Sequence, residues 1–113
     1  IIDHSKLTGV KIRESEVLDL YSGTGSFGLE CLSRGSKKIY FIEKDNFSYN
    51  ILKKNIKLTQ MENKSVCFHL DVNTFLKKNK KKLDIIFFTF YGVYYIFILY
   101  TIYYFTYFIS LSP

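Results

Sequence analysis

A strand, a glycine-rich turn and a helix constrain this chain more than any other stretch. An apolar segment begins at Val17, and Gly23, Gly25 and Gly28 follow it in the spacing G-x-G-x-x-G. Glycine lets the backbone turn sharply and approach a ligand closely, while the start of the next helix directs free N–H groups toward it. Glu43 stands 20 residues after Gly23, where a carboxylate can bind ribose hydroxyls. This unit therefore predicts a binding site for a cofactor that contains a nucleoside.

The segments around this unit alternate between strand-like and helix-like patterns. Short apolar runs predict strands at residues 16–21, 38–42, 66–70 and 83–88. Apolar residues at helical spacing predict helices at residues 27–33, 45–58 and 72–80. We expect Gly35 to close the first helix and Asp45 or Asn46 to cap the second. Strands that alternate with helices in this way indicate an α/β fold with a parallel sheet.

The helix predicted at residues 45–58 has a pattern of its own. Five apolar residues approximate a helical period, namely Phe47, Ile51, Leu52, Ile56 and Leu58. The lysines at 53, 54 and 57 lie toward its C-terminal half, which suits the helix dipole.

Length, charge and cysteine usage limit the class of protein. The chain has 113 residues, which is one domain at most. Its net charge of +6 favours an anionic partner such as nucleic acid or a membrane surface, and a solvated lysine-rich surface would carry the same charge. Cys31 and Cys67 have no C-x-x-C spacing and no histidine cluster near them. We therefore expect reduced thiols and no metal site.

The last 29 residues, 85–113, contain no charged side chain and hold 13 of the chain's 21 aromatic residues. We therefore divide the chain into a partial cofactor-binding domain at 1–88 and an uncharged, aromatic-rich tail at 89–113. Three interpretations of the tail stay open. We favour a shifted reading frame in an A/T-rich gene. The run also exceeds the ~20 residues that span a bilayer as a helix, and it could instead pack on the sheet as a hydrophobic ending.

Acidic residues accompany three successive predicted strands. Asp19 lies within the first, Glu43 ends the second and Asp71 follows the third. Because open α/β sheets bind ligands at the carboxyl ends of their strands, these acids are expected to share one crevice. Dinucleotide dehydrogenases have the same glycine spacing, but their first strand normally carries no acid near its end. Asp19 instead matches the methyltransferase pattern, in which acids orient the cationic methionine portion of S-adenosylmethionine, hold its ribose and contact its adenine.

The stretch VLDLYSGTGSFGLECLSRGSKKIYFIEKD resembles the ribosomal RNA small-subunit methyltransferase D family, whose members methylate the N2 amine of a guanine in 16S rRNA. The steps Phe27-Gly28-Leu29-Glu30 and Ser33-Arg34-Gly35 extend the resemblance beyond the general glycine pattern, and it covers about residues 1–88. It implies a Rossmann-like class I fold, the fold of S-adenosylmethionine-dependent methyltransferases, with the N-terminal parallel-sheet half present.

The same resemblance assigns residues to the cofactor S-adenosyl-L-methionine. It implies that Glu43 binds the ribose and that Asp71 contacts the adenine. The residues implied to line the methionine end are Asp19, Ser22, Gly23 and Gly25.

The resemblance ends after the fourth predicted strand. There the family carries Asp-Pro-Pro-Tyr or Asp-Pro-Pro-Phe, a turn that positions the target amine against the cofactor's methyl group. This chain has Thr89-Phe90-Tyr91-Gly92 instead, without the acid and without both prolines. We therefore expect a truncated or frame-shifted copy that does not transfer methyl groups. The alternatives are a non-enzymatic remnant attached to a membrane through the tail and, less favoured, an NAD-binding oxidoreductase.

The resemblance also implies partners and a location. These are 16S rRNA, or an assembly intermediate of the small ribosomal subunit, in the cytoplasm, and we expect a monomer. The lysines at 77, 78, 80, 81 and 82 could contact RNA phosphates. We favour the plainer interpretation that they form a solvated end of a helix.

Overall fold

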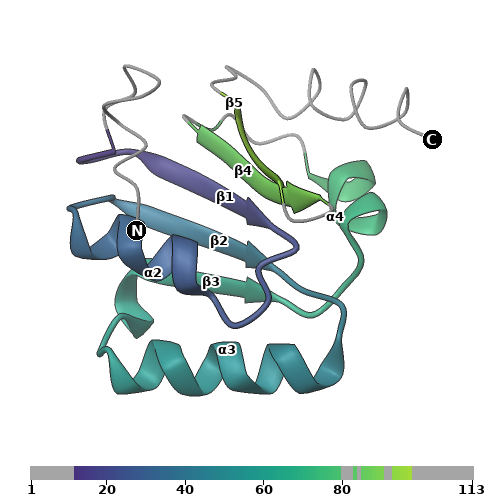
Figure 1. The fold of residues 1–113 in the computed structure, drawn as a ribbon, viewed down its shortest axis with the longest axis horizontal. Coiled ribbons are helices and arrows are strands. Elements are labelled where there is room, and N and C mark those ends of the chain that lie inside the picture. The colour runs from purple at the N-terminus through teal and green to yellow at the C-terminus, as the bar shows by residue number, and fades with distance from the viewer. Residues whose placement is uncertain (1–11, 80–82, 84, 91–92, 98–113) are drawn as a thin grey trace.

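The structure, a computed structural model, describes residues 12–79, 83, 85–90 and 93–97. The described strands form one sheet in the order β3-β2-β1-β4-β5 (Figure 1). The element bounds are Glu16–Leu20 for β1, Ser26–Ser33 for α2, Lys38–Ile42 for β2, Asn46–Leu58 for α3, Glu62–Lys64 for a 3₁₀ turn, Ser65–Phe68 for β3, Val72–Lys78 for α4, Ile85–Phe90 for β4 and Val93–Phe97 for β5. The pairs among β3, β2, β1 and β4 are parallel, and β5 is antiparallel to β4. The predicted α/β fold with a parallel sheet is confirmed.

Both faces of the sheet are covered by helices, as a parallel sheet requires. Side chains alternate between the two faces along each strand. On one face, residues of α2 and α3 pack against β1 and β2 in a cluster formed by Ile12, Val17, Cys31, Leu32, Ile39, Phe41, Leu52 and Ile56. On the other face, α4 packs against the same strands in a cluster formed by Leu18, Leu20, Tyr40, Ile42, Val72, Phe75, Leu76 and Leu83.

Two helix ends follow the predicted local rules. Asp45 caps α3, because its Oδ2 accepts a hydrogen bond from the amide three residues further on at 2.9 Å. α2 ends in a Schellman motif, with Gly35 at a φ of +97°. In this motif the amide of Gly35 donates to the carbonyl of Leu32 at 3.1 Å, and that of Ser36 to Cys31 at 3.0 Å. Both predicted caps are confirmed.

Several element bounds differ from those expected. The third strand covers residues 65–68 rather than 66–70, α4 ends at 78 rather than 80, and the fourth strand covers 85–90 rather than 83–88. The third strand ends early because Asp71 is the N-cap of α4, so that the residues before it turn into the helix. Residue 80 lies outside the described residues.

α3 buries fewer apolar side chains than its pattern predicts. Leu52 and Ile56 are buried, whereas Phe47 is 73% and Leu58 is 74% exposed. At 3.6 residues per turn, Phe47 and Leu58 lie roughly 120–140° around the helix from Leu52. Two members of the apolar pattern, Phe47 and Leu58, therefore face away from the sheet.

β4 runs past residue 88 and pairs with β5, which begins in the predicted tail. Thr89 lies opposite Tyr94, and Phe90 lies opposite Val93. Parallel strands need a connection of a dozen or more residues, so two strands separated only by residues 91–92 pair in antiparallel orientation. In the part of the chain that the structure describes, no helix is long and apolar enough to cross a membrane. Residues 98–113 of the tail lie outside that part.

Candidate functional site

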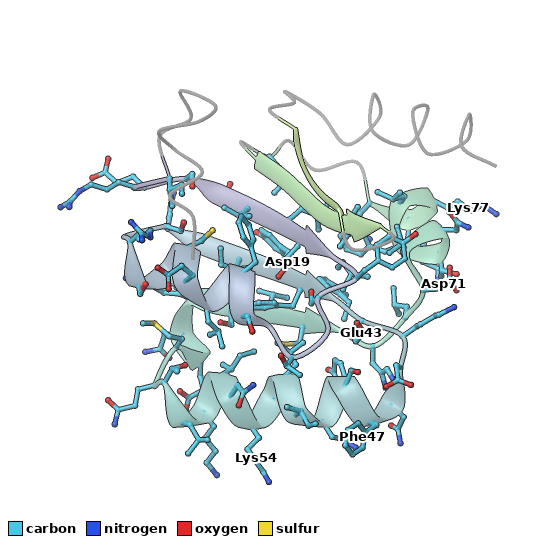
Figure 2. The ribbon with its side chains drawn as sticks, viewed as in Figure 1. Asp19, Glu43, Phe47, Lys54, Asp71 and Lys77 are labelled. Atoms are coloured by element: carbon cyan, nitrogen blue, oxygen red, sulfur yellow. The ribbon has the colours of Figure 1, made fainter. Side chains whose placement is uncertain are left out.

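The segments that follow β1, β2 and β3 meet at one edge of the sheet. The three strands are parallel and in register, so their carboxyl ends lie together at the arrowheads in Figure 1. Asp19 lies in β1, Glu43 directly follows β2, and Asp71 begins α4 (Figure 2). The structure therefore brings all three predicted acids to the same edge.

The glycine turn is held to the end of β2 by Ser22. The amide of Ser22 donates to the carbonyl of Ile42 at 3.0 Å, and the Ser22 hydroxyl accepts from the amide of Ile42 at 3.1 Å. The same hydroxyl donates to the carbonyl of Asp19 at 2.6 Å. The Ser22 side chain thus fixes the turn relative to both strands, and its predicted role at the methionine end of a cofactor stays a prediction.

Glu43 connects the glycine turn to the start of α3. Its Oε1 accepts from the amide of Gly23 at 2.7 Å, and its Oε2 accepts from the amide of Asp45 at 2.8 Å. Gly23 has a φ of +59°, and a Cβ built on it would meet no atom within 4 Å. The backbone beside the Glu43 carboxylate is therefore open to a ligand.

Gly28, the last glycine of the turn, serves packing rather than ligand approach. A Cβ at Gly28 would lie 2.3 Å from Cε1 of Phe41 in β2. α2 therefore sits close against the sheet because this residue has no side chain. Gly25 has a φ of +89° and packs similarly against the side chain of Leu52.

Asp19 is the most unusual group at this edge. It is 1% exposed, and its Oδ2 has no hydrogen-bond partner among the described residues. Burial raises the pKa of Asp19 to about 8; a backbone hydrogen bond from Gly28 lowers the pKa, and the charge of Glu43 raises it. A buried acceptor without a partner is costly. A cationic group placed beside it would remove that cost, so the site fits a ligand with an ammonium group.

Asp71 has a structural role in this conformation. Its Oδ1 accepts from the amide of Thr74 at 2.8 Å, and its Oδ2 accepts from the Thr74 hydroxyl at 2.7 Å. These bonds to Thr74 hold the pKa of Asp71 below its usual value. Asp71 is an exposed N-cap of α4, and its predicted contact with adenine stays a prediction.

A small cavity beside Asp71 includes residues that were not predicted. It is lined by Tyr21, Ile42, Lys44, Leu70, Asp71, Val72 and Asn73. Tyr21 has a φ of +56°, which is uncommon for a bulky residue and often marks a functional site. The prediction of a strand over residues 16–21 placed Tyr21 inside that strand, and nothing in the sequence singled out Lys44.

The sequence at the end of β4 reads Thr89-Phe90-Tyr91-Gly92. β4 pairs with β1 up to the pair Leu20–Phe88, and Thr89 follows at the same edge of the sheet. Thr89 lies in the ladder with β5, opposite Tyr94. The Asp-Pro-Pro-aromatic turn that the resemblance attributes to the family does not occur in this sequence, as expected above.

The chain is similar to known methyltransferases. The ribosomal RNA small subunit methyltransferase D of Haemophilus influenzae is 37% identical over 79 residues, which are 67% of this chain and 41% of that protein. A solved structure from the same species, of a protein proposed to be a methylase, matches with a TM-score of 0.65 at 31% identity, over 74% of this chain and 55% of the other. A SAM-dependent methyltransferase from Agrobacterium tumefaciens shares the fold with a TM-score of 0.60 at 21% identity, over 67% and 25% of the two chains.

The fold defines the class of this protein: it has the Rossmann-like α/β fold of class I S-adenosylmethionine-dependent methyltransferases. The family described as conserved hypothetical protein 95 matches residues 4–89. The chain belongs to this family, the ribosomal RNA small-subunit methyltransferase D family, and the predicted resemblance is confirmed. The chain spans less than half of the length of its Haemophilus influenzae relative.

Proposed function

We propose that the edge formed by Asp19, the glycine turn and Glu43 binds S-adenosyl-L-methionine. The observation that carries this proposal is the buried Oδ2 of Asp19, which has no hydrogen-bond partner among the described residues. The cofactor's methionine portion has an ammonium group that can satisfy this oxygen by a charge-assisted hydrogen bond. NAD would instead place the negative charges of a pyrophosphate at the turn, close to Asp19 and Glu43. The negative charge of Glu43 disfavours those phosphates, and a protonated Asp19 offers them no positive partner.

The assignments of the ribose and the adenine depend on the hydrogen-bond acceptors that are still available at this edge and on the open space there. Glu43 accepts from two amides, and an ionised carboxylate has about four lone-pair sites, so it can also accept from ribose hydroxyls. Gly23 leaves room for the ligand to approach the backbone. Asp71 keeps acceptor sites beyond those used in capping, and it lies at the cavity with Tyr21 and Lys44, where we place the adenine.

We propose that the reaction served by this site is methylation of the N2 amine of a guanine in 16S rRNA. The substrate would be 16S rRNA or an assembly intermediate of the small ribosomal subunit, in the cytoplasm. When bound, S-adenosylmethionine supplies an electrophilic methyl group on a sulfonium. The protein's contribution is to hold the target amine in line with that group, which is work of positioning.

We further propose that this 113-residue chain binds the cofactor but does not transfer its methyl group. A carboxylate at the end of β4 would accept hydrogen bonds from the target amine and orient it. Thr89 stands there instead, and a hydroxyl cannot accept as a carboxylate does. The pairing of Thr89 with Tyr94 also keeps this backbone in a strand rather than in a turn.

A labelling experiment tests both parts of the proposal. The chain is incubated with S-adenosylmethionine carrying a tritiated methyl group and either 16S rRNA or small ribosomal subunits. We expect S-adenosylhomocysteine to bind in a parallel titration and no tritium to enter the RNA. Incorporated label would contradict the inactivity of the chain, and lack of binding would contradict the cofactor assignment.

A further inference from the structure

The outward face of α3 combines exposed apolar groups with positive charge. We define the outer α3 face by Phe47, Asn50, Lys54, Lys57 and Leu58, all of which are exposed. Figure 2 shows Phe47 and Lys54 projecting from α3 away from the sheet. Exposed large apolar side chains that gather on one face mark interaction sites more often than scattered ones do.

The charge on this face has one sign. α3 contains lysines at 53, 54 and 57 and no Asp or Glu between Asn46 and Leu58. In a helix whose lysines form ion pairs with acids of the same helix, Asp or Glu would stand three or four residues from those lysines. Lysines without acids beside them fit a polyanion, whose phosphates attract them over several ångströms.

The aromatic end of this face adjoins the cofactor site. Phe47 lies in the first turn of α3, and the amide of Asp45, the cap of that turn, donates to Glu43. Two positions further along the helix, on another side of it, the ring of Tyr49 is stacked on that of His69, with centroids 4.3 Å apart and planes 10° apart. A nucleotide bound along α3 would therefore lie next to Glu43, at the edge of the proposed cofactor site.

We propose that the outer α3 face binds single-stranded RNA, with a base on the ring of Phe47 and phosphates at Lys54 and Lys57. Single-stranded binding surfaces combine aromatic rings, which stack on any base, with cations that follow the backbone. Phe47 and Lys54 are seven residues apart, two helical turns, and so lie on the same side of α3. The proposal rests on the proposed function, because it adds the RNA surface to the cofactor site.

Fluorescence anisotropy with a labelled single-stranded oligonucleotide of 16S rRNA sequence tests this surface. The full chain is titrated at several salt concentrations, together with Phe47→Ala and with the double variant Lys54→Glu/Lys57→Glu. We expect Phe47→Ala to weaken binding about tenfold at every salt concentration, since it removes the aromatic ring on which a base stacks. For the lysine variant, the plot of log K against log salt concentration should be less steep. We expect the magnitude of its slope to decrease by about 1.4, which is about 0.7 for each lost phosphate contact.

The matched control replaces two lysines at the opposite edge of the sheet by glutamate, which reverses their charge. Lys37 and Lys64 line an open cavity with Glu14, Gly35 and Ser36, at the amino ends of the strands. Lys37→Glu/Lys64→Glu changes the net charge by the same amount and should leave the salt slope close to that of the wild type. An equal loss of slope in the control would show general electrostatic attraction and overturn the proposal.

Two further measurements separate the remaining outcomes. S-adenosylhomocysteine affinity, measured for each variant, should be unchanged and reports on folding. If the variants lose RNA binding and the wild-type chain does not bind the cofactor, the proposed cofactor is refuted and the proposed RNA surface is supported. If Phe47→Ala abolishes binding to vesicles of anionic phospholipid and leaves RNA binding intact, the face is a membrane surface and the proposal is wrong.

Discussion

Replacing Asp19 by asparagine is expected to remove a pH dependence of stability between pH 4 and 8. Burial raises the pKa of Asp19 from 3.8 to about 8. In the unfolded chain the carboxyl group loses its proton at about pH 4, whereas in the folded chain it keeps it up to about pH 8. The folded state therefore binds more protons within this window. The contribution of Asp19 to the free energy of unfolding of the wild type is then highest below pH 4 and falls as pH rises toward 8.

The size of this effect follows from the two pKa values. Each pH unit between them contributes about 1.4 kcal/mol, so the loss across the window is at most about 6 kcal/mol. Asparagine has nearly the same shape and no proton to lose in this range. Cys31, which feels the charge of Asp19, has a pKa raised by burial to about 12 and stays a thiol throughout.

Urea unfolding at several pH values between 5 and 8, followed by circular dichroism, measures the effect. The free energy of unfolding of Asp19→Asn, minus that of the wild type, should increase with pH. Parallel pH profiles for the two proteins would refute the assignment of a buried, protonated Asp19. Cofactor binding provides a second readout, because an ammonium group beside Asp19 favours its ionised form. Binding of S-adenosylhomocysteine at pH 7 should release a proton from the wild type and none from the variant, as calorimetry in buffers of different ionisation enthalpy would detect.

Three further substitutions have defined outcomes. Glu43→Ala removes the acceptor of two amides and the proposed ribose contact, so calorimetry should show at least about tenfold weaker binding of S-adenosylhomocysteine; unchanged affinity would show that the ribose assignment is misplaced. Gly28→Ala places a methyl group against the Phe41 ring and should lower the free energy of unfolding in urea by about 1–3 kcal/mol; wild-type stability would mean that α2 shifts without cost. Asp71→Ala removes the cap of α4 and should cost about 1 kcal/mol in the same assay, and no loss would show that water replaces the cap.

The parts of the fold that could be predicted rest on local patterns. The second strand was predicted with its observed bounds, residues 38–42, because a short apolar run lies between a helix-ending glycine and an acid. Asp19, Glu43 and Asp71 reach one edge because parallel strands in register align their carboxyl ends. These relations depend on residues close together in the sequence and on the known geometry of parallel sheets.

The parts that could not be predicted depend on tertiary contacts. Nothing in the sequence shows that Oδ2 of Asp19 is buried and has no partner within the described part of the chain, since this depends on how closely α2 packs against the sheet. Phe47 and Leu58 belong to an apolar pattern, and only the packing of α3 decides that they face outward. The capping role of Asp71 has a local signal, an acid three residues before Thr74, that the strand prediction for residues 66–70 obscured.

Side-by-side calorimetric titrations with S-adenosylhomocysteine and NAD test the central claim most directly. The claim is that Asp19, the glycine turn and Glu43 form a site for the methyltransferase cofactor. We predict measurable binding of S-adenosylhomocysteine to the wild-type chain and weaker or undetectable binding of NAD. Tighter binding of NAD would contradict the claim.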